Sequence, residues 1–399
     1  MHASKDRFGI ARVAEPLAFW FITLFLCGVV FTRSAGMTDF RSYYVAGELA
    51  RHEPYALYSV AAQTKGQLSI GPGSFFPWAH LPPEAALMSP LTLAPFKTAF
   101  HLWQGVNLFL LVVAVYPLKR YFSGYSAAAV ALIPAVIGFS VGQDHIVTLL
   151  VFVFAFLSLK GGKEFRAGCI LGIGLLRYGI TLPLLLFFLV ARRWRVMAGS
   201  AVSGSLLIIA SFVIVGRDFI PQYVRMCEFL SASHNSPDAA RMPTVRGFLT
   251  VLFPHSPHLF LAVAVLSAVL LIWGLLRWSS WDESTADLDT LFPLALVISL
   301  LIDYHGFIYN MTSLLLPGLL LVRRHPKASG FLWLCAAATL AIAFAPRAYF
   351  GLLAPLYLGI AIWTERRSSL DRIGEADLSS SRTPWQVSQL LTIHSEVIP

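Results

Sequence analysis

Apolar stretches dominate the chain and alternate with short polar connections along its whole length. They cover residues 16–32, 100–118, 125–141, 144–159, 167–176, 179–191, 196–215, 258–277, 289–303, 306–322, 330–345 and 348–364. A helix crosses a bilayer in roughly 20 apolar residues, so these stretches are candidate membrane spans. The pattern predicts an all-α integral membrane protein, polytopic, with about 11–12 membrane helices.

The composition supports this class of protein. Of the 399 residues, 57% are hydrophobic and 13% are charged, whereas an ordinary soluble domain has roughly 25% charged residues. A disordered chain and a typical soluble enzyme are therefore excluded. The four cysteines form no Cys-x-x-Cys pair, so neither a zinc site nor a disulfide framework is indicated.

Basic residues follow alternate apolar stretches, and this pattern accounts for the net charge of +9. The residues are Lys119, Arg120, Lys160, Lys163, Arg166, Arg192, Arg193, Arg195, Arg277, Arg323, Arg324, Lys327, Arg366, Arg367 and Arg372. Lys and Arg are enriched in cytoplasmic connections, and all of these fall on the cytoplasmic side if every stretch turns the chain round. We see no interleaved basic and aromatic patch, so nucleic acid is not an expected partner.

The orientation depends on residues 167–191, which are too short for two full spans. As one helix they would rise about 37 Å, enough for a single tilted span. Basic clusters flank both ends, which favours a return to the same side, and Gly174 and Pro183 would permit a hairpin of two short helices. We therefore predict the hairpin, which places Ser236 outside; a single span would invert everything downstream.

With the hairpin, residues 1–367 form one membrane domain. Its two large outer loops cover about 33–99 and 216–257, and the first is rich in proline and aromatic residues, which predicts a structured extracytoplasmic loop. Residues 368–399 are polar and are expected to form a disordered cytoplasmic tail.

Some polar residues cannot be explained by the orientation of loops, and most fall near the outer ends of predicted helices. They are Asp39, Arg41, Gln143, Asp144, His145, Arg177, Arg241, Arg246, Asp303, Tyr304, His305 and Asn310. Ionisable groups at membrane depth usually face a cavity or a partner, so this set predicts one polar site at the membrane surface. Asp144 and His145 could pair locally, but with no third ligand nearby we predict no metal site.

Several motifs in this region occur in a recognisable order. They are Asp39-Phe40-Arg41-Ser42-Tyr43-Tyr44, Phe75-Phe76-Pro77-Trp78, Pro82-Pro83-Glu84, Gly142-Gln143 and Met242-Pro243-Thr244-Val245-Arg246-Gly247. Their order over about residues 36–325 resembles glycosyltransferase family 87, whose known members are bacterial mannosyltransferases that use polyprenol-phosphate-mannose. The resemblance implies a GT-C type fold and a multi-pass protein of the bacterial inner membrane.

The resemblance also implies the reaction. A hexosyl, in this family mannosyl, residue would pass from a polyprenyl-phosphate sugar to a lipid or glycan acceptor at the extracytoplasmic face, with inversion and without a cofactor or metal. Asp39 matches the position of the family's catalytic aspartate, and its role would be that of general base. The alternative is that Asp39 caps the helix that follows.

The donor phosphate needs groups that stabilise developing negative charge. His305 and Arg246 match family positions for this contact, and Arg177 stands where the family usually has Lys followed by Pro. His305 could instead be a buried histidine bonded to Asp303 or Tyr304, and Arg246 an ordinary loop charge. Further candidates for substrate binding are Arg41, Tyr43, Tyr44, Gln143, Asp303 and Tyr304.

Two other functions fit twelve spans. A lipid or solute transporter is one, although, apart from Arg177, charge is absent from the middle of the spans. A polysaccharide polymerase or ligase is the other, but those enzymes usually carry their arginines and histidine in a large late loop, whereas here the first loop is the longest. A membrane glycosyltransferase is therefore the favoured prediction.

Overall fold

The computed structural model describes residues 3–32, 38–73, 75–121, 125–231, 238–279 and 285–365. Within these ranges the regular elements are all helical and no strand occurs, so the all-α prediction is confirmed. Ser236 and the predicted tail 368–399 lie outside the described residues.

The helices follow one another with short connections. Those named below are α1 (Ala3–Thr32), α2 (Thr38–His52), η1 (Pro54–Ala56), α3 (Val60–Ile70), α4 (Pro82–Met88), η2 (Ser89–Leu93), α5 (Phe96–Val115), η3 (Tyr116–Tyr121), α6 (Tyr125–Val141), α7 (His145–Lys160), α8 (Glu164–Ile173), η4 (Gly174–Arg177), α9 (Tyr178–Val190), α10 (Trp194–Val215), α11 (Phe219–Ser231), η5 (Ala239–Arg241), α12 (Val245–Leu252), α13 (Leu259–Ser279), α14 (Thr285–Ile302), η6 (Ile308–Leu314), α15 (Leu315–Arg324) and α16 (Ser329–Ala343). A last helix covers residues 354–365.

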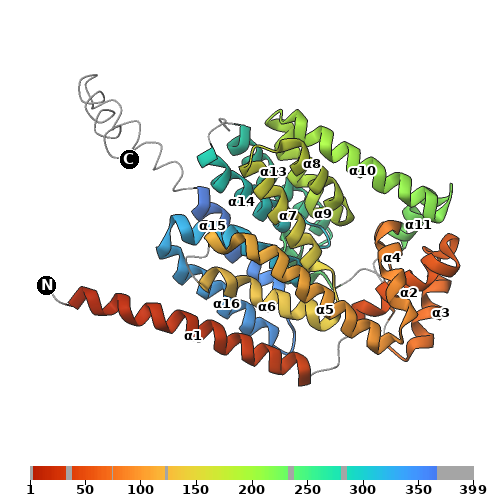
Figure 1. Ribbon diagram of the computed structural model, residues 1–399, viewed down its shortest axis with the longest axis horizontal. Helices are drawn as coiled ribbons and strands as arrows, with labels where there is room; N and C mark the ends of the chain where they lie inside the picture. Colours follow the sequence, from red (N-terminus) through yellow and green to blue (C-terminus); the bar gives the residue numbers. More distant parts are fainter. Residues whose placement is uncertain are drawn as a thin grey trace, which may run out of the picture.

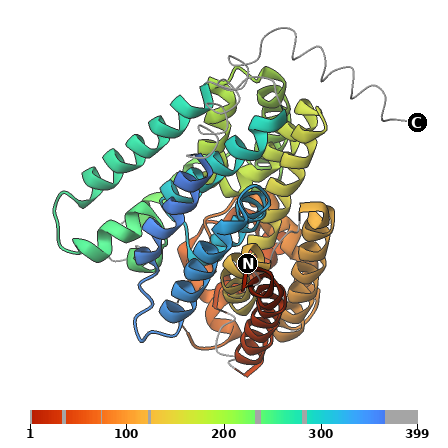
Figure 2. The same ribbon diagram turned by 90° about the vertical axis from the view of Figure 1, so that its left-hand side faces the viewer.

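Five helical segments in the described part of the chain are long and apolar enough to cross a membrane. They are Phe96–Tyr121, Glu164–Val190, Trp194–Val215, Leu259–Ser279 and Pro326–Ala343. Shorter apolar helices precede, separate and follow them, at Val13–Leu26, Tyr125–Val141, His145–Lys160, Leu288–Ile302 and Phe350–Glu365. In Figure 2, α13 stands at the outer edge of the bundle, and its Phe260, Val265 and Leu276 are exposed. Apolar side chains exposed along such a helix suit contact with lipid, so the chain is a polytopic membrane protein.

The segment Glu164–Val190 turns back on itself. A straight helix of its 27 residues would separate its ends by about 40 Å. Yet Nη1 of Arg193, three residues beyond Val190, lies 3.1 Å from Oε1 of Glu164 at the start of the segment. The chain turns at η4, where the Thr181 hydroxyl donates to the Gly174 carbonyl over 2.6 Å. The predicted hairpin is therefore present, with α8 and α9 as its two short arms.

The second arm returns the chain to the start of α8, so α10 runs parallel to α8 and packs closely on it. Gly168 and Gly172 of α8 face the α10 backbone at residues 196 and 200, where a Cβ on either glycine would overlap backbone atoms. Ser200 donates to the Gly168 carbonyl over 3.0 Å, and Ser203 donates to the Cys169 carbonyl over 2.7 Å. Small residues and interhelical hydrogen bonds are how membrane helices pack without a hydrophobic driving force.

This contact makes a prediction for stability. Replacing Gly168 with Ala would place its methyl group against the Val196 carbonyl oxygen, and overpacking of this kind costs about 1–3 kcal/mol. The melting temperature of the purified protein should therefore fall. Gly105 of α5 is the control, because a Cβ there meets open space, so Gly105→Ala should not lower the melting temperature. Equal melting temperatures for the two variants would contradict the close packing.

The basic connections gather at one end of the bundle, which we call the basic end. There Nζ of Lys160 lies 2.9 Å from Oδ1 of Asp289 at the start of α14, and Arg324 donates to Thr290 one residue further on. The Arg323 guanidinium lies 4.8 Å from the centroid of the Tyr121 ring. Connections that are distant in sequence thus share one end, and the loops between the other ends of the helices meet at the opposite end.

That opposite end carries a separate helical unit, the end unit, formed by α2–α4, η1, η2 and α11. Figure 1 shows α2, α3, α4 and α11 gathered there. The unit has its own apolar core, in which Phe40, Tyr43 and Trp78 of the first loop are packed with Phe219 and Met226 of α11. The prediction that the first loop is structured is confirmed.

Candidate active site

The turn between α6 and α7 brings two polar side chains to the end unit. Gly142 ends α6 with a positive φ of 79°, and the N–H groups of Gly142 and Gln143 both donate to the Gly138 carbonyl over 2.9 Å. Glycine is favoured at such helix ends, and here a Cβ would also strike Phe40 of α2. The close approach of α2 to this turn places Gln143 and Asp144 against it.

The amide of Gln143 connects two residues of α2. Its Nε2 donates to Oδ2 of Asp39 over 2.5 Å, and its Oε1 accepts from the Tyr43 hydroxyl over 2.8 Å. Gln143 and Tyr43 are both buried. The amide therefore holds the Asp39 carboxylate in place without sharing a proton with it.

Asp39 lies in the first turn of α2. The N-terminal end of a helix carries partial positive charge and stabilises a carboxylate there. Its bond to Gln143 also gives the side chain a partner 104 residues away, which a residue that served only its own helix would not need. A role for Asp39 as helix cap and a role in chemistry are both compatible with this position.

Arg177 stands at the tip of the hairpin and collects the remaining polar groups. Its Nη2 forms an ion pair with Asp144 and donates to the Tyr43 hydroxyl over 2.5 Å. Its Nη1 donates to Nδ1 of His80 over 2.5 Å, and its Nη2 lies 3.7 Å from Oε1 of Glu84. Asp144 thus pairs with Arg177 rather than with the neighbouring His145 that the sequence suggested.

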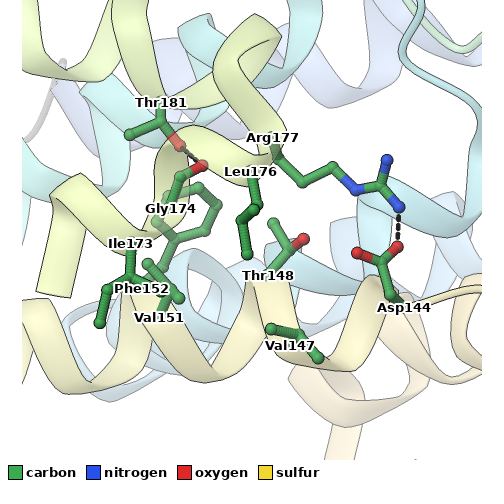
Figure 3. Close-up of a pocket in the computed structure, with 10 residues that line it drawn as sticks. All are labelled: Asp144, Val147, Thr148, Val151, Phe152, Ile173, Gly174, Leu176, Arg177 and Thr181. Carbon is green, nitrogen blue, oxygen red and sulfur yellow. Dashed lines mark hydrogen bonds and ion pairs between the residues drawn. The ribbon is translucent and has the colours of Figure 1, made fainter. Parts of the chain in front are cut away.

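A small cavity of about 10 Å³, room for about one water molecule, lies beside this ion pair, between α7 and η4. Figure 3 shows Arg177 and Asp144 at one side of it and Ile173, Val151 and Phe152 at the other. The cavity is therefore polar on one side and apolar on the other.

His80, which precedes α4, and Glu84, in the first turn of α4, complete the contacts of Arg177. Burial raises the pKa of Glu84 to about 7, although the Arg177 guanidinium acts in the opposite direction. Burial and then the charge of Arg177 lower the pKa of His80. A neutral His80 can accept the bond from Arg177, which the protonated form could not.

The raised pKa of Glu84 predicts a pH dependence of stability. In the unfolded chain this carboxyl loses its proton near pH 4.5, and in the folded protein near pH 7, so the folded state binds the extra proton between these values. Its contribution to stability is fully present below pH 4.5 and is lost as the pH rises through 7, by at most on the order of 3 kcal/mol. Relative to Glu84→Gln, the wild-type melting temperature should fall over this interval. Parallel melting curves across the pH range would contradict the assignment.

A second polar group lies where α14 ends. Nη1 of Arg246 donates to the Tyr304 carbonyl over 3.0 Å and lies 3.4 Å from Nδ1 of His305, and its guanidinium stacks 4.0 Å from the centroid of the Tyr304 ring. Thr244 accepts from the Gly247 N–H as the N-cap of α12, which starts this helix beside the loop. The structure thus brings together the predicted residues Arg246, Tyr304 and His305.

His305 is neutral at physiological pH in this arrangement. Burial and the neighbouring charge of Arg246 lower the pKa of His305 to about 4. If its Nδ1 accepts the bond from Arg246, then the proton of the ring resides on Nε2. The imidazole can therefore donate one hydrogen bond to an oxygen outside the Arg246 contact.

Asp303 lies between the polar group around Arg177 and the polar group around Arg246. It is buried, its Oδ1 accepts from the backbone N–H of His305 over 3.2 Å, and its carboxylate occupies the space beside Gly179 that a Cβ there would fill. Gly179 follows Arg177 by two residues, and the charges of Asp303 and Arg177 interact. The two polar groups therefore border one region at this end of the bundle, which we call the site end.

Two predicted binding residues lie elsewhere. The Arg41 guanidinium donates to the carbonyls of Gln67 and Pro72, over 2.7 and 3.2 Å, where α3 ends. The Tyr44 hydroxyl donates to the Ala94 carbonyl over 3.0 Å. Both side chains thus stabilise the end unit through backbone contacts.

Sequence reasoning missed three residues of the site. His80 and Glu84 contact Arg177, and Tyr309 interacts electrostatically with Asp39, Arg177 and Asp303. A glutamate within the apolar Pro-Pro-Glu-Ala-Ala segment was the one visible signal, because buried glutamate is rare without a partner.

A family model provides an independent comparison. The model for glycosyltransferase family 87 matches residues 78–302, which is more than half of the chain. The chain belongs to glycosyltransferase family 87. The matched part includes Gln143, Arg177 and Arg246, whereas Asp39 precedes it and His305 follows it. Searches of curated proteins and of solved structures gave no match.

Membership of family 87 makes the protein a membrane glycosyltransferase. Such an enzyme needs a sugar donor and an acceptor, and a group that accepts the proton of the acceptor hydroxyl. The residues grouped at the site end include carboxylates, a neutral imidazole and two guanidinium groups.

Proposed function

We propose that this family 87 enzyme transfers a hexosyl residue, mannosyl in our assignment, from a polyprenyl-phosphate sugar to a lipid or glycan acceptor. The proposed architecture is of the GT-C type, and the reaction takes place at the extracytoplasmic face of a bacterial inner membrane. The observation that supports this best is the hydrogen bond by which Gln143 holds the Asp39 carboxylate. Gln143 directly precedes Asp144, which forms the ion pair with Arg177.

The proposed step is a direct displacement with inversion. Asp39 takes the proton of an acceptor hydroxyl while its oxygen forms a bond to the anomeric carbon of the donor. The bond from that carbon to the phosphate oxygen breaks, and the electron pair leaves with the phosphate. A positioned carboxylate suits the base, because proton removal is needed only as the new bond forms.

Arg246 and His305 are the proposed contacts of the departing phosphate. An arginine can bind a phosphate through two N–H groups at once, and the Nε2–H of a neutral His305 can donate to a third oxygen. Arg177 is held by Asp144 and Glu84, so a phosphate there would share the guanidinium with two acids. We therefore rank Arg177 behind the other two and assign it mainly to positioning Tyr43 and His80.

The charge distribution supports the proposed orientation. Lys160, Arg193 and Arg324 lie at the basic end, opposite Asp39 and His305. Basic connections face the cytoplasm in most membrane proteins, which would leave the site end on the other side. An acceptor from the aqueous phase could then meet a donor held in the bilayer.

The experiment is a transfer assay on the purified protein in lipid nanodiscs. Polyprenyl-phosphate mannose and polyprenyl-phosphate glucose are each supplied with a membrane lipid extract, and the products are identified by mass spectrometry. We expect addition of one hexose from the mannose donor, with the opposite anomeric configuration by NMR. Movement of donor or solute across the bilayer without any transfer would overturn the proposal.

The same assay tests the metal requirement. The residues described contain no group of three or more His, Cys, Asp or Glu side chains placed to hold a metal, and arginine and histidine can supply positive charge at the phosphate. Turnover should therefore persist in chelator. Loss of turnover that magnesium or manganese restores would contradict this mechanism.

A further inference from the structure

The end unit carries an open groove that the proposed chemistry does not use. Its volume is about 280 Å³, and it lies between the start of α3 and the middle of α11. Tyr55, Tyr58, Gln222, Arg225 and Met226 contribute to its lining. This volume is close to the lower end, about 300 Å³, of the range of pockets that bind small molecules.

The lining combines buried side chains with exposed ones. Tyr58 and Met226 are buried, and the Tyr58 ring packs against Tyr223 at a centroid distance of 5.4 Å, with an interplanar angle of 74°. Tyr55 is 66% exposed, and Gln222 and Arg225 add an amide and a guanidinium on the α11 side.

This combination matches the chemistry of a sugar ring. An aromatic face covers the C–H side of a pyranose, while amide and guanidinium groups donate hydrogen bonds to its hydroxyls. A lipid chain would cover the apolar part of the lining, which Tyr55, Val60 and Met226 supply, but would offer no hydrogen-bond partner to Gln222 and Arg225. A purely ionic ligand would not need an exposed tyrosine ring. The groove therefore favours a neutral glycan over these other occupants.

The groove is also linked to the active site. The hydroxyl of Tyr58 donates to the backbone carbonyl of His80 over 2.7 Å, and the ring of His80 accepts from Arg177. His80 further packs between Trp78 and Tyr43, at centroid distances of 4.6 and 5.5 Å. His80 therefore connects Tyr58, in the wall of the groove, to Arg177 and Tyr43 of the candidate site.

We infer that the groove formed by Tyr55, Tyr58, Gln222 and Arg225 binds the glycan part of the acceptor, distal to the hydroxyl that receives the sugar. The inference rests on the proposed function, because it assigns the acceptor of that reaction to a glycan. In this assignment the donor binds to the bundle, and the acceptor binds to the end unit.

The experiment compares Tyr55→Ala, Tyr55→Phe and Tyr116→Ala in the transfer assay. Tyr116 is the matched control, because it is 65% exposed but belongs to η3, which ends at Tyr121 at the basic end. Loss of one aromatic contact should raise the acceptor KM of Tyr55→Ala roughly two- to tenfold, with kcat, donor KM and donor hydrolysis by water unchanged. Tyr55→Phe and Tyr116→Ala should behave like the wild type.

Direct binding keeps the groove testable if no transfer is found. Mannobiose, maltose and lactose serve as probes, and saturation-transfer NMR reports their contact with the protein. A signal for at least one disaccharide that Tyr55→Ala abolishes and Tyr116→Ala retains would support the groove, whatever the donor is. Unchanged acceptor KM in Tyr55→Ala, or a disaccharide signal that Tyr55→Ala does not alter, would overturn the inference.

Discussion

Replacing Asp39 with Asn should lower turnover roughly 10²–10⁴-fold, the contribution expected of a general base. Asn keeps the size of the side chain and can still bond to Gln143 if either amide reorients, but it cannot accept the acceptor proton. Expression, melting temperature and donor affinity should change little. The measurement is kcat in the nanodisc assay beside donor binding to the same preparation.

Asp238 provides the control for this variant. Its carboxylate accepts from the Ala240 N–H as the N-cap of η5, and Asn caps helices about as well as Asp. Asp238→Asn should therefore retain turnover. If Asp39→Asn also retained turnover in a folded protein, Asp39 would be a helix-capping residue and the base would have to be sought elsewhere.

Replacing Arg177 with Gln should destabilise the protein by about 3–5 kcal/mol, because it removes one partner of a buried charge pair. The buried Asp144 carboxylate would lose its ion-pair partner, and Glu84 would lose its nearest cation. Adding Asp144→Asn to Arg177→Gln should restore part of the loss, since the unpaired carboxylate is then gone. Chemical unfolding in detergent compares the wild type with both variants.

Arg193 is the control for the Arg177 experiment. Its ion pair with Glu164 is partly exposed at the basic end, and such pairs contribute about 1 kcal/mol or less. Arg193→Gln should therefore unfold close to the wild type. A stable Arg177→Gln protein with a raised donor KM would show that Arg177 contributes more to binding the donor phosphate than to stability.

The spans and the hairpin could be predicted because their signals are local. Apolar runs mark the helices, and the basic residues around 167–191 indicate that the chain returns to the same end. The contact between Glu164 and Arg193 is a direct consequence of that return. Asp39, Arg177 and Arg246 stood out for a similarly local reason, since each is a charge that the orientation of the loops does not explain.

The pairings within the site could not be predicted in the same way. Gln143 meets Asp39 across 104 residues, and Arg177 meets His80 across 97, so each depends on how α2 and α4 pack on the bundle. Arg41 is a residue for which the sequence suggested a contact with substrate that the structure does not show. It is as polar as its neighbours, but the direction of its side chain from α2 takes it to the carbonyls at the end of α3, and sequence spacing alone does not reveal that direction.

The apolar core of the end unit, to which Phe100 and Trp103 of α5 and Val215 of α10 also belong, has a consequence for engineering. Asp39 and the Tyr55 groove belong to that unit, whereas Gln143, Arg177 and Arg246 belong to the bundle. A chimera that exchanges the unit between related enzymes would move the proposed base and the proposed acceptor groove together, and it would leave the proposed donor contacts in the bundle unchanged. The activity of such a hybrid would depend on the contacts between the two parts. Gln143 must still bond to an aspartate, and Arg177 to a tyrosine.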